Sequence, residues 1–206
     1  MVRILGRANS INVQKVMWCA GEIGLDVERV DVGMNFGGND TSEYLAKNPN
    51  GLVPVIEDGD FVCWESHAIV RYMTETYATG SWNPESPKIR AKANQWMDWF
   101  LSRVHPLMTV IFWNVVRLPP EQRDGAAAEK AIGEIGAVWK ILDAQLAGKD
   151  FVLGDAPSIG DIPVGCATYR YFGMDIEHPD LPNMRAWYER LAERPAYQQN
   201  VMLPIT

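Results

Sequence analysis

The chain has few cysteines, no long apolar run and no excess of positive charge. Its three cysteines, Cys19, Cys63 and Cys166, are isolated from one another, with no CxxC pair and no Cys/His spacing suited to zinc. This disfavours a disulfide framework and a structural metal, so we expect no metal. The longest apolar stretch, about Leu107 to Trp113, is far shorter than the roughly 18 residues of a membrane span. The N-terminus also lacks the apolar core of a signal peptide. We therefore expect a soluble, cytoplasmic protein without membrane contact.

The composition is acidic, with 19 Lys+Arg against 26 Asp+Glu and a formal net charge of -7. Phosphate binding needs clustered Lys and Arg, and no such run is present, so a nucleic-acid partner is not expected. The chain is instead rich in hydrophobic residues, which make up 47% of its 206 residues and include eight Trp. That content predicts a sizeable core without disulfide support, in one large domain or two small ones.

Two sequence patterns meet near residue 80. Up to residue 79, short apolar runs alternate with amphipathic ones, whereas from residue 88 apolar residues recur almost throughout at the helical period. The segment between them is rich in turn-forming residues. We therefore predict one domain over 1–79 and a second over 88–206.

The first region predicts the element order βαβαββα. Strands are expected at 2–6, 26–32, 54–57 and 61–64, and helices at 12–23, 42–47 and 66–77. A βαβ crossover implies a parallel strand pair, whereas Asp58-Gly59 between the last two strands is typical of a two-residue antiparallel hairpin. Ser66 is expected to cap the last helix. The prediction is an α/β domain with a mixed, thioredoxin-like sheet.

The second region predicts an all-α bundle. A long helix with apolar residues from Ile89 to Val104 in register is expected to kink at Pro106 and resume to about Arg117. Further helices are expected at 126–146, from residue 158 and near 182. Ser158 and Asp161 form a capping box, in which the hydroxyl accepts from the N–H of Asp161 and the carboxylate from the N–H of Ser158.

Four short segments together resemble the glutathione transferase family. They are Asn50 to Val55, Trp64 to Ile69, Ser158 to Asp161 and Glu193 to Tyr197, and the resemblance spans all 206 residues. It implies a thioredoxin-like N-terminal domain with the glutathione site, a helical C-terminal domain with an apolar pocket, and a homodimer active in detoxification. Glutathione would be a co-substrate, with no tightly bound cofactor.

Two dipeptides carry the implied glutathione site. The sequence alone favours an ordinary trans bond at Val53-Pro54, but in the family this Pro is cis and directs the backbone of the preceding residue to the cysteinyl unit of glutathione. Glu65-Ser66 reads from sequence alone as a helix start. The resemblance adds binding of the γ-glutamyl carboxylate by Ser66 and the helix N-terminus. For Glu65 two roles stay open, which are binding of the γ-glutamyl amine and orientation of the loop.

The partner of the glycine carboxylate of glutathione is the least defined part of the site. Leu52 occupies a position where some relatives have Lys, and Asn39 one where some have His. Asn39 could still donate to this carboxylate. Arg7, Lys15 and a residue of the partner subunit are open alternatives.

The catalytic donor is expected in the loop before the first helix. The thiolate is the nucleophile, and a free thiol of pKa about 8.5 is only slightly ionised at neutral pH. Lowering that pKa to about 6.5 needs about 2.7 kcal/mol, which one hydrogen bond to the anion, at about 1.5–3 kcal/mol, can supply. The resemblance favours Ser10 as donor, with Asn12 as the competing donor. Helix capping is the alternative for both residues.

The second substrate is expected to be a hydrophobic electrophile. Ile11 in the loop and Trp113 after the kink are the predicted pocket residues, and Met108 and Phe112 are further candidates. A Met and aromatic stripe at helical spacing is more often core than pocket.

Three functions remain open at this stage. The first is a transferase that activates the glutathione thiolate for attack on an electrophile. The second is a glutathione-dependent disulfide reductase that uses the same site without an enzyme cysteine. The third is a non-catalytic binding or assembly module, since this fold also serves assembly alone.

Overall fold

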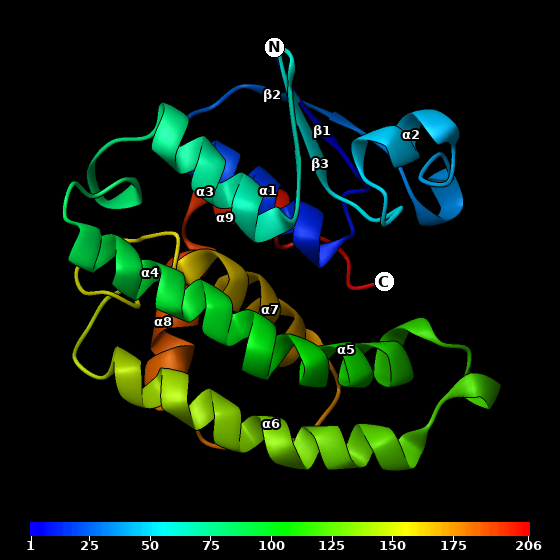
Figure 1. Ribbon diagram of the computed structural model, residues 1–206. Coiled ribbons are helices and arrows are strands. Elements are labelled where there is room, and N and C mark those ends of the chain that lie inside the picture. The colour runs from blue at the N-terminus through cyan, green and yellow to red at the C-terminus, as the bar shows by residue number, and fades with distance from the viewer. The chain divides into compact units, whose positions relative to one another are not determined.

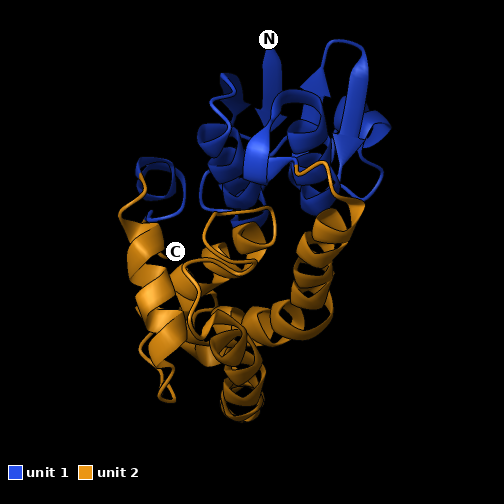
Figure 2. Ribbon diagram, turned by 90° about the vertical axis from the view of Figure 1, so that its left-hand side faces the viewer, with its two compact units in different colours: residues 1–83, 195–203 blue, residues 84–194, 204–206 orange.

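The computed structural model describes all 206 residues and divides them into two compact units (Figure 2). The first unit comprises residues 1–83 and 195–203, and the second comprises residues 84–194 and 204–206. No helix in either unit has the length and apolar character needed to cross a membrane.

The first unit is built on a four-stranded mixed sheet, as predicted (Figure 1). The strands are β1 (Val2–Leu5), β2 (Val27–Val30), β3 (Val55–Asp58) and β4 (Phe61–Trp64), in the order β2-β1-β3-β4. β1 pairs parallel with β2 and antiparallel with β3, and β3 and β4 form the expected antiparallel hairpin. The helices of this unit are α1 (Ile11–Glu22), α2 (Ser42–Lys47), α3 (Ser66–Tyr77) and α9 (Pro195–Asn200).

Helix α9 joins the first unit although it lies far along the chain from the other elements. Trp18 of α1 packs edge-on against Tyr197 of α9, with ring centroids 4.7 Å apart. Gly21 allows the close approach, because a Cβ there would lie 3.0 Å from the Cβ of Ala196. Residues 195–203 were predicted to belong to the helical domain, since no periodicity within α9 encodes the contact of Tyr197 with Trp18, which lies 179 residues earlier in the chain.

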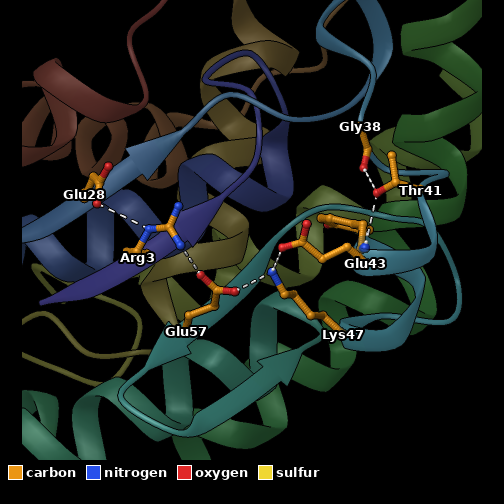
Figure 3. Close-up of polar contacts among 8 residues, drawn as sticks. Arg3, Glu28, Gly38, Thr41, Glu43, Lys47 and Glu57 are labelled. Carbon is orange, nitrogen blue, oxygen red and sulfur yellow. Dashed lines mark hydrogen bonds and ion pairs between the residues drawn. The ribbon is translucent and has the colours of Figure 1, made fainter.

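A network of ion pairs connects helix α2 to strands β1, β2 and β3 of the sheet (Figure 3). Arg3 of β1 lies 3.3 Å from Glu28 of β2 and 2.6 Å from Glu57 of β3. Lys47 of α2 joins the same Glu57 at 2.8 Å and its own helix neighbour Glu43 at 3.0 Å. The pKa of Lys47 is raised by hydrogen bonds to these two carboxylates. The network holds α2 against the sheet, and α2 is the helix that precedes the loop leading into β3.

The second unit is wholly helical, as predicted (Figure 1). Its helices are α4 (Pro87–Trp99), α5 (His105–Phe112), α6 (Gly125–Leu146), α7 (Asp161–Gly173) and α8 (Pro182–Ala192). Just before Pro106, where the sequence predicts a kink, the α-helix is interrupted by the π-helical segment Phe100–Val104. Proline lacks the N–H for an α-helical bond, which accounts for the irregular turn. Ile89 is exposed rather than part of the buried stripe.

The capping box before α7 differs in one half from its prediction. The Asp161 carboxylate accepts from the Ser158 N–H at 2.9 Å, as predicted. The Ser158 hydroxyl, however, donates to the same carboxylate at 3.0 Å and accepts from the N–H of Gly160, not that of Asp161. The helix therefore begins at Asp161 rather than at Ser158.

Candidate functional site

A glycine after β1 brings the loop before α1 against two neighbouring segments. A Cβ on Gly6 would lie 2.4 Å from Cγ2 of Val13 in α1 and 3.2 Å from Cβ of Val53. Only glycine permits this approach, so residue 6 fixes residues 7–10 beside both the first turn of α1 and the segment that enters β3. Gly6 was expected at the end of the strand, without this role, although an isolated glycine in a strand commonly marks such an approach.

Ser10 stands at the N-cap of α1 but does not cap the helix. Its backbone carbonyl accepts from the Gln14 N–H at 2.9 Å, whereas its side chain forms no capping bond. The residue is buried, at 7% exposure. The capping alternative for Ser10 is therefore wrong, and its hydroxyl stays available to a ligand.

Asn12 lies in the first turn of α1, two positions past the N-cap, so it does not cap the helix either. Its amide oxygen Oδ1 accepts from Nζ of Lys15 at 2.9 Å and lies 3.5 Å from the hydroxyl oxygen of Ser66. The second contact joins the N-terminal turns of α1 and α3. Ser10, Asn12 and Ser66 are thereby gathered at two neighbouring helix N-termini.

The start of α3 differs from the predicted cap. Glu65, not Ser66, is the N-cap residue, and neither Glu65 nor any other side chain caps the helix there. Glu65 has φ 75 and ψ 110, a conformation that costs a non-glycine residue of order 1–3 kcal/mol and that clusters at ligand sites. Ser66 is buried as the first helical residue. The first-turn N–H groups of α3 have no carbonyl partner within the helix.

The Val53-Pro54 peptide bond is cis, as the resemblance implied. The backbone N–H and C=O of Val53 form none of the hydrogen bonds of the chain. Leu52 has a different environment, since its side chain is 66% exposed while its carbonyl accepts from Tyr44 Oη and Asn48 Nδ2, both at 2.7 Å. No sequence pattern indicates these two donors, which hold the loop that leads to Val53.

Asn39 supports this loop from a second side. Its amide Nδ2 donates to the Gly51 carbonyl at 2.8 Å. One N–H of the same amide remains for a ligand. Binding of the glycine carboxylate by Asn39 stays a prediction.

The predicted pocket residues for the second substrate differ in burial. Met108 and Phe112 are buried, so they belong to the core of the helical unit. Trp113 is 41% exposed at the end of α5, with the Arg117 guanidinium 5.6 Å from its ring centroid. Ile11 is the first residue of α1, in the other unit, and is partly exposed. Their role in electrophile binding stays a prediction.

The cysteines do not contribute a nucleophile to this site. Cys19 lies in the core of α1, and burial raises the pKa of its thiol far above the ordinary value. Burial also raises the pKa of the Cys63 thiol. None of the three cysteines forms a disulfide. A thiolate acting at the α1 N-terminus must therefore come from a ligand.

Comparison with known families gives two matches that follow one another along the chain. Residues 2–75 match the N-terminal domain of glutathione S-transferase, and residues 104–195 match its C-terminal domain. The chain belongs to the glutathione S-transferase family. The predicted family, the two-part fold and the glutathione transferase activity are thereby confirmed, with glutathione as the co-substrate.

Individual relatives match the transferase over its whole length. The glutathione S-transferase GstB of Escherichia coli is 39% identical over 100% of both chains, and glutathione S-transferase 3 of Zea mays is 30% identical, covering 97% of this chain and 93% of its own. A solved theta class glutathione S-transferase from Xanthomonas axonopodis pv. citri, with glutathione bound, is 45% identical with a TM-score of 0.96. That match covers 100% of this chain and 99% of the other.

Proposed function

We propose that the α1 N-terminus holds the sulfur of glutathione as a thiolate, with the Ser10 hydroxyl as donor and the Asn12 amide as a second donor. The observation that carries this proposal is the hydroxyl of a buried N-cap serine that caps nothing. The thiol proton passes to solvent. The thiolate then forms a carbon–sulfur bond with an electrophilic carbon of an apolar substrate, whose leaving group departs with the electron pair.

The energies of these contacts are sufficient for the proposed chemistry. A hydrogen bond to the charged sulfur contributes about 1.5–3 kcal/mol, and the N-terminus of α1 adds about 0.3–1 kcal/mol. Together they match the roughly 2.7 kcal/mol that lowers a thiol pKa by about two. No general base is needed, because the hydrogen bonds favour the anion directly.

The rest of glutathione fits the neighbouring segments. We assign its cysteinyl backbone to the unpartnered N–H and C=O of Val53, in the manner of an added strand. The γ-glutamyl carboxylate is assigned to the N-terminus of α3 with the Ser66 hydroxyl, and the γ-glutamyl amine to the Glu65 carboxylate, which is exposed. Glu65→Gln should raise the KM for glutathione and leave kcat nearly unchanged; an unchanged KM would remove Glu65 from the site.

The test of the thiolate donors is steady-state conjugation of 1-chloro-2,4-dinitrobenzene by Ser10→Ala and Asn12→Ala variants. We expect Ser10→Ala to lower kcat/KM by roughly ten- to hundredfold, the kinetic equivalent of one hydrogen bond to an anion. Ser86→Ala is the matched control, since Ser86 is also an N-cap serine without a capping bond but belongs to the helical unit. Activity unaffected by both Ser10→Ala and Asn12→Ala would exclude these residues from the mechanism.

Two further measurements address the alternative functions. Calorimetric titration should give heat on adding glutathione to the intact protein, and its absence at millimolar ligand would indicate an assembly module. Reduction of hydroxyethyl disulfide by glutathione, faster than any conjugation, would instead support the disulfide reductase.

We also propose that the transferase is a homodimer. The edge strand β4 supports this, because its residues Phe61, Val62 and Trp64 are 40%, 41% and 38% exposed, and an apolar edge strand is a site of association. Sedimentation should give twice the monomer mass, and Val62→Glu should shift the protein toward monomers. A wild-type protein that sediments as a monomer at all concentrations would contradict the proposal.

We also propose a cytoplasmic location, because the thiol chemistry of the protein and its co-substrate suits that compartment. Three cysteines outside any disulfide and a thiol co-substrate suit a reducing compartment. Cell fractionation that recovers the protein outside the cytoplasm would contradict this inference.

A further inference from the structure

Lys15 is an unusual residue for its place in the transferase. Its side chain is 0% exposed in the second turn of α1, whereas lysine is almost never fully buried and normally extends its ammonium to water. Burial of a charge is costly unless polar partners compensate it. One such partner is the amide oxygen of Asn12, which accepts from Lys15 Nζ at 2.9 Å.

This contact fixes the orientation of the Asn12 amide. An ammonium group has donors only, so the corner of the amide that faces Lys15 must be the oxygen. The Ser66 hydroxyl lies on the same oxygen, at 3.5 Å. The nitrogen Nδ2 occupies the opposite corner and has no partner in the chain, and Asn12 is only partly buried. Both N–H groups of the amide are therefore left for a ligand.

We propose that Lys15 is a positioning residue that holds the Asn12 amide with its N–H groups toward the glutathione sulfur and strengthens them as donors. The proposal rests on the proposed function of Asn12 as a thiolate donor. A hydrogen bond from a charged group to an amide oxygen polarises that amide, and in a water-poor site the effect is larger than in solvent. Lys15 also supplies positive charge beside the site in a protein whose formal net charge is -7.

The spacing along α1 explains why this arrangement is available. Residues three apart lie on one face of a helix, so position 15 can reach back to position 12. Arginine and glutamine at the same position would also present donors, whereas methionine would fill a similar volume without any. These three substitutions separate the charge, the hydrogen bond and the packing of Lys15.

The test is the pH dependence of kcat/KM for conjugation in Lys15→Met, together with the ultraviolet absorbance of the bound glutathione thiolate. We expect both midpoints to rise by about one pH unit, equivalent to roughly tenfold lower kcat/KM on the acidic side. Lys15→Arg should restore most of the wild-type midpoint, and Lys15→Gln should lie between Met and the wild type. A lysine that merely supports packing would alter the melting temperature and leave the midpoint unchanged, and that result would overturn the proposal.

The charged and titratable groups near α1 remain the same in all these variants. The elements that pack against α1 are β1, α3 and α9. Their charged and titratable groups, with those of α1 itself and the adjoining loops, are Arg3, Arg7, Cys19, Glu22, Glu65, His67, Arg71, Tyr72, Glu75, Tyr77 and Tyr197. Lys47→Met is the matched control, since Lys47 also forms ion pairs but with Glu43 and Glu57 of the sheet network. It should leave the midpoint unaltered.

A double-mutant cycle separates this proposal from the proposed function. If Asn12 is the donor that Lys15 positions, Lys15→Met should not move the midpoint further in an Asn12→Ala background. A midpoint that moves with Asn12→Ala but not with Lys15→Met overturns the role of Lys15 alone. A midpoint indifferent to Asn12→Ala removes Asn12 as a donor and the Lys15 proposal with it. Should Lys15→Met not fold, Lys15→Gln gives the same decision.

Discussion

The helix starts of the transferase divide into two kinds. At α7, both oxygens of Asp161 are occupied: Oδ1 accepts from the Val152 N–H and Trp187 Nε1, and Oδ2 from the backbone and hydroxyl of Ser158. At α1, the N-cap serine uses none of its side-chain capacity. The first kind stabilises the fold, and the second leaves donors for a ligand. Polar residues at helix starts thus differ in how many of their hydrogen bonds are already made within the chain.

Asp161→Ala should give the largest effect, and the effect should be on stability alone. The substitution strands several buried donors, each at about 1–3 kcal/mol, so we expect a loss of roughly 3–5 kcal/mol in the free energy of unfolding. The melting temperature should fall by roughly 10 °C for a chain of this size. Thermal and denaturant unfolding would measure this, with Asp161→Asn as a milder control that retains one acceptor oxygen. A loss of unfolding free energy below about 0.5 kcal/mol, as for a surface substitution, would contradict the stabilising role of Asp161.

Thr41→Ala should have a moderate effect of the same kind. The Thr41 hydroxyl oxygen accepts from the Tyr44 N–H at 3.2 Å and caps α2 (Figure 3). Loss of such a cap costs about 1 kcal/mol. Denaturant unfolding should register it, while kcat/KM for conjugation should remain that of the wild type. A large kinetic effect would mean that α2 takes part in the site.

Ser10→Ala should lower activity and leave stability nearly unchanged, whereas the two preceding variants should lose stability and keep their activity. Since the Ser10 side chain forms no capping bond, we expect its removal to change the free energy of unfolding by less than about 0.5 kcal/mol. The same denaturant melts that detect Thr41→Ala serve as the measurement. A loss of 1 kcal/mol or more would show that Ser10 stabilises α1 after all, and the contrast between the two kinds of helix start would fail.

Tyr77→Phe should give the smallest effect, at the opposite end of α3. The hydroxyls of Tyr77 and Tyr72 donate to the Asp58 carboxylate, and these bonds lower its pKa below the ordinary value. A depressed carboxyl pKa stabilises the fold above the ordinary pKa of about 3.9, and the contribution disappears as pH falls through the folded-state pKa.

NMR titration would measure the pKa of Asp58 in the wild type and in Tyr77→Phe. It should rise toward its ordinary value in Tyr77→Phe. The stability difference between the two proteins should be present at neutral pH and shrink in acid. An unaltered Asp58 pKa would mean that Tyr72 alone accounts for the depression.

Much of the fold was predictable because its signals are local. The helices at 42–47 and 66–77 and the strand at 61–64 have the predicted bounds, since apolar periodicity and an Asp-Gly turn act within a few residues. Other boundaries shifted by one or more positions, as at β2. The place of α9 was not predictable, because Trp18 and Tyr197 meet only through tertiary packing.

The sequence names candidate residues for the site but does not give their burial or their hydrogen-bond partners. Resemblance to the family selected Ser10 and Asn12, yet capping remained open for both, because any serine or asparagine at a helix start can accept a backbone hydrogen bond. The structure decided the question through neighbours far along the chain, such as Ser66 beside Asn12. The burial of Lys15 likewise has no signal in composition.

The sequence by itself determined the element types, the mixed sheet, the helical second unit and the absence of a cysteine nucleophile in the loop before α1. Each of these depends on local periodicity, turn chemistry or residue identity. Only the tertiary structure decided which polar side chains are already satisfied and which are left for a ligand. A polar side chain finds its hydrogen-bond partners mostly on other elements of the chain. Those partners are therefore fixed only once α1, α3 and the segment around Val53 are packed together.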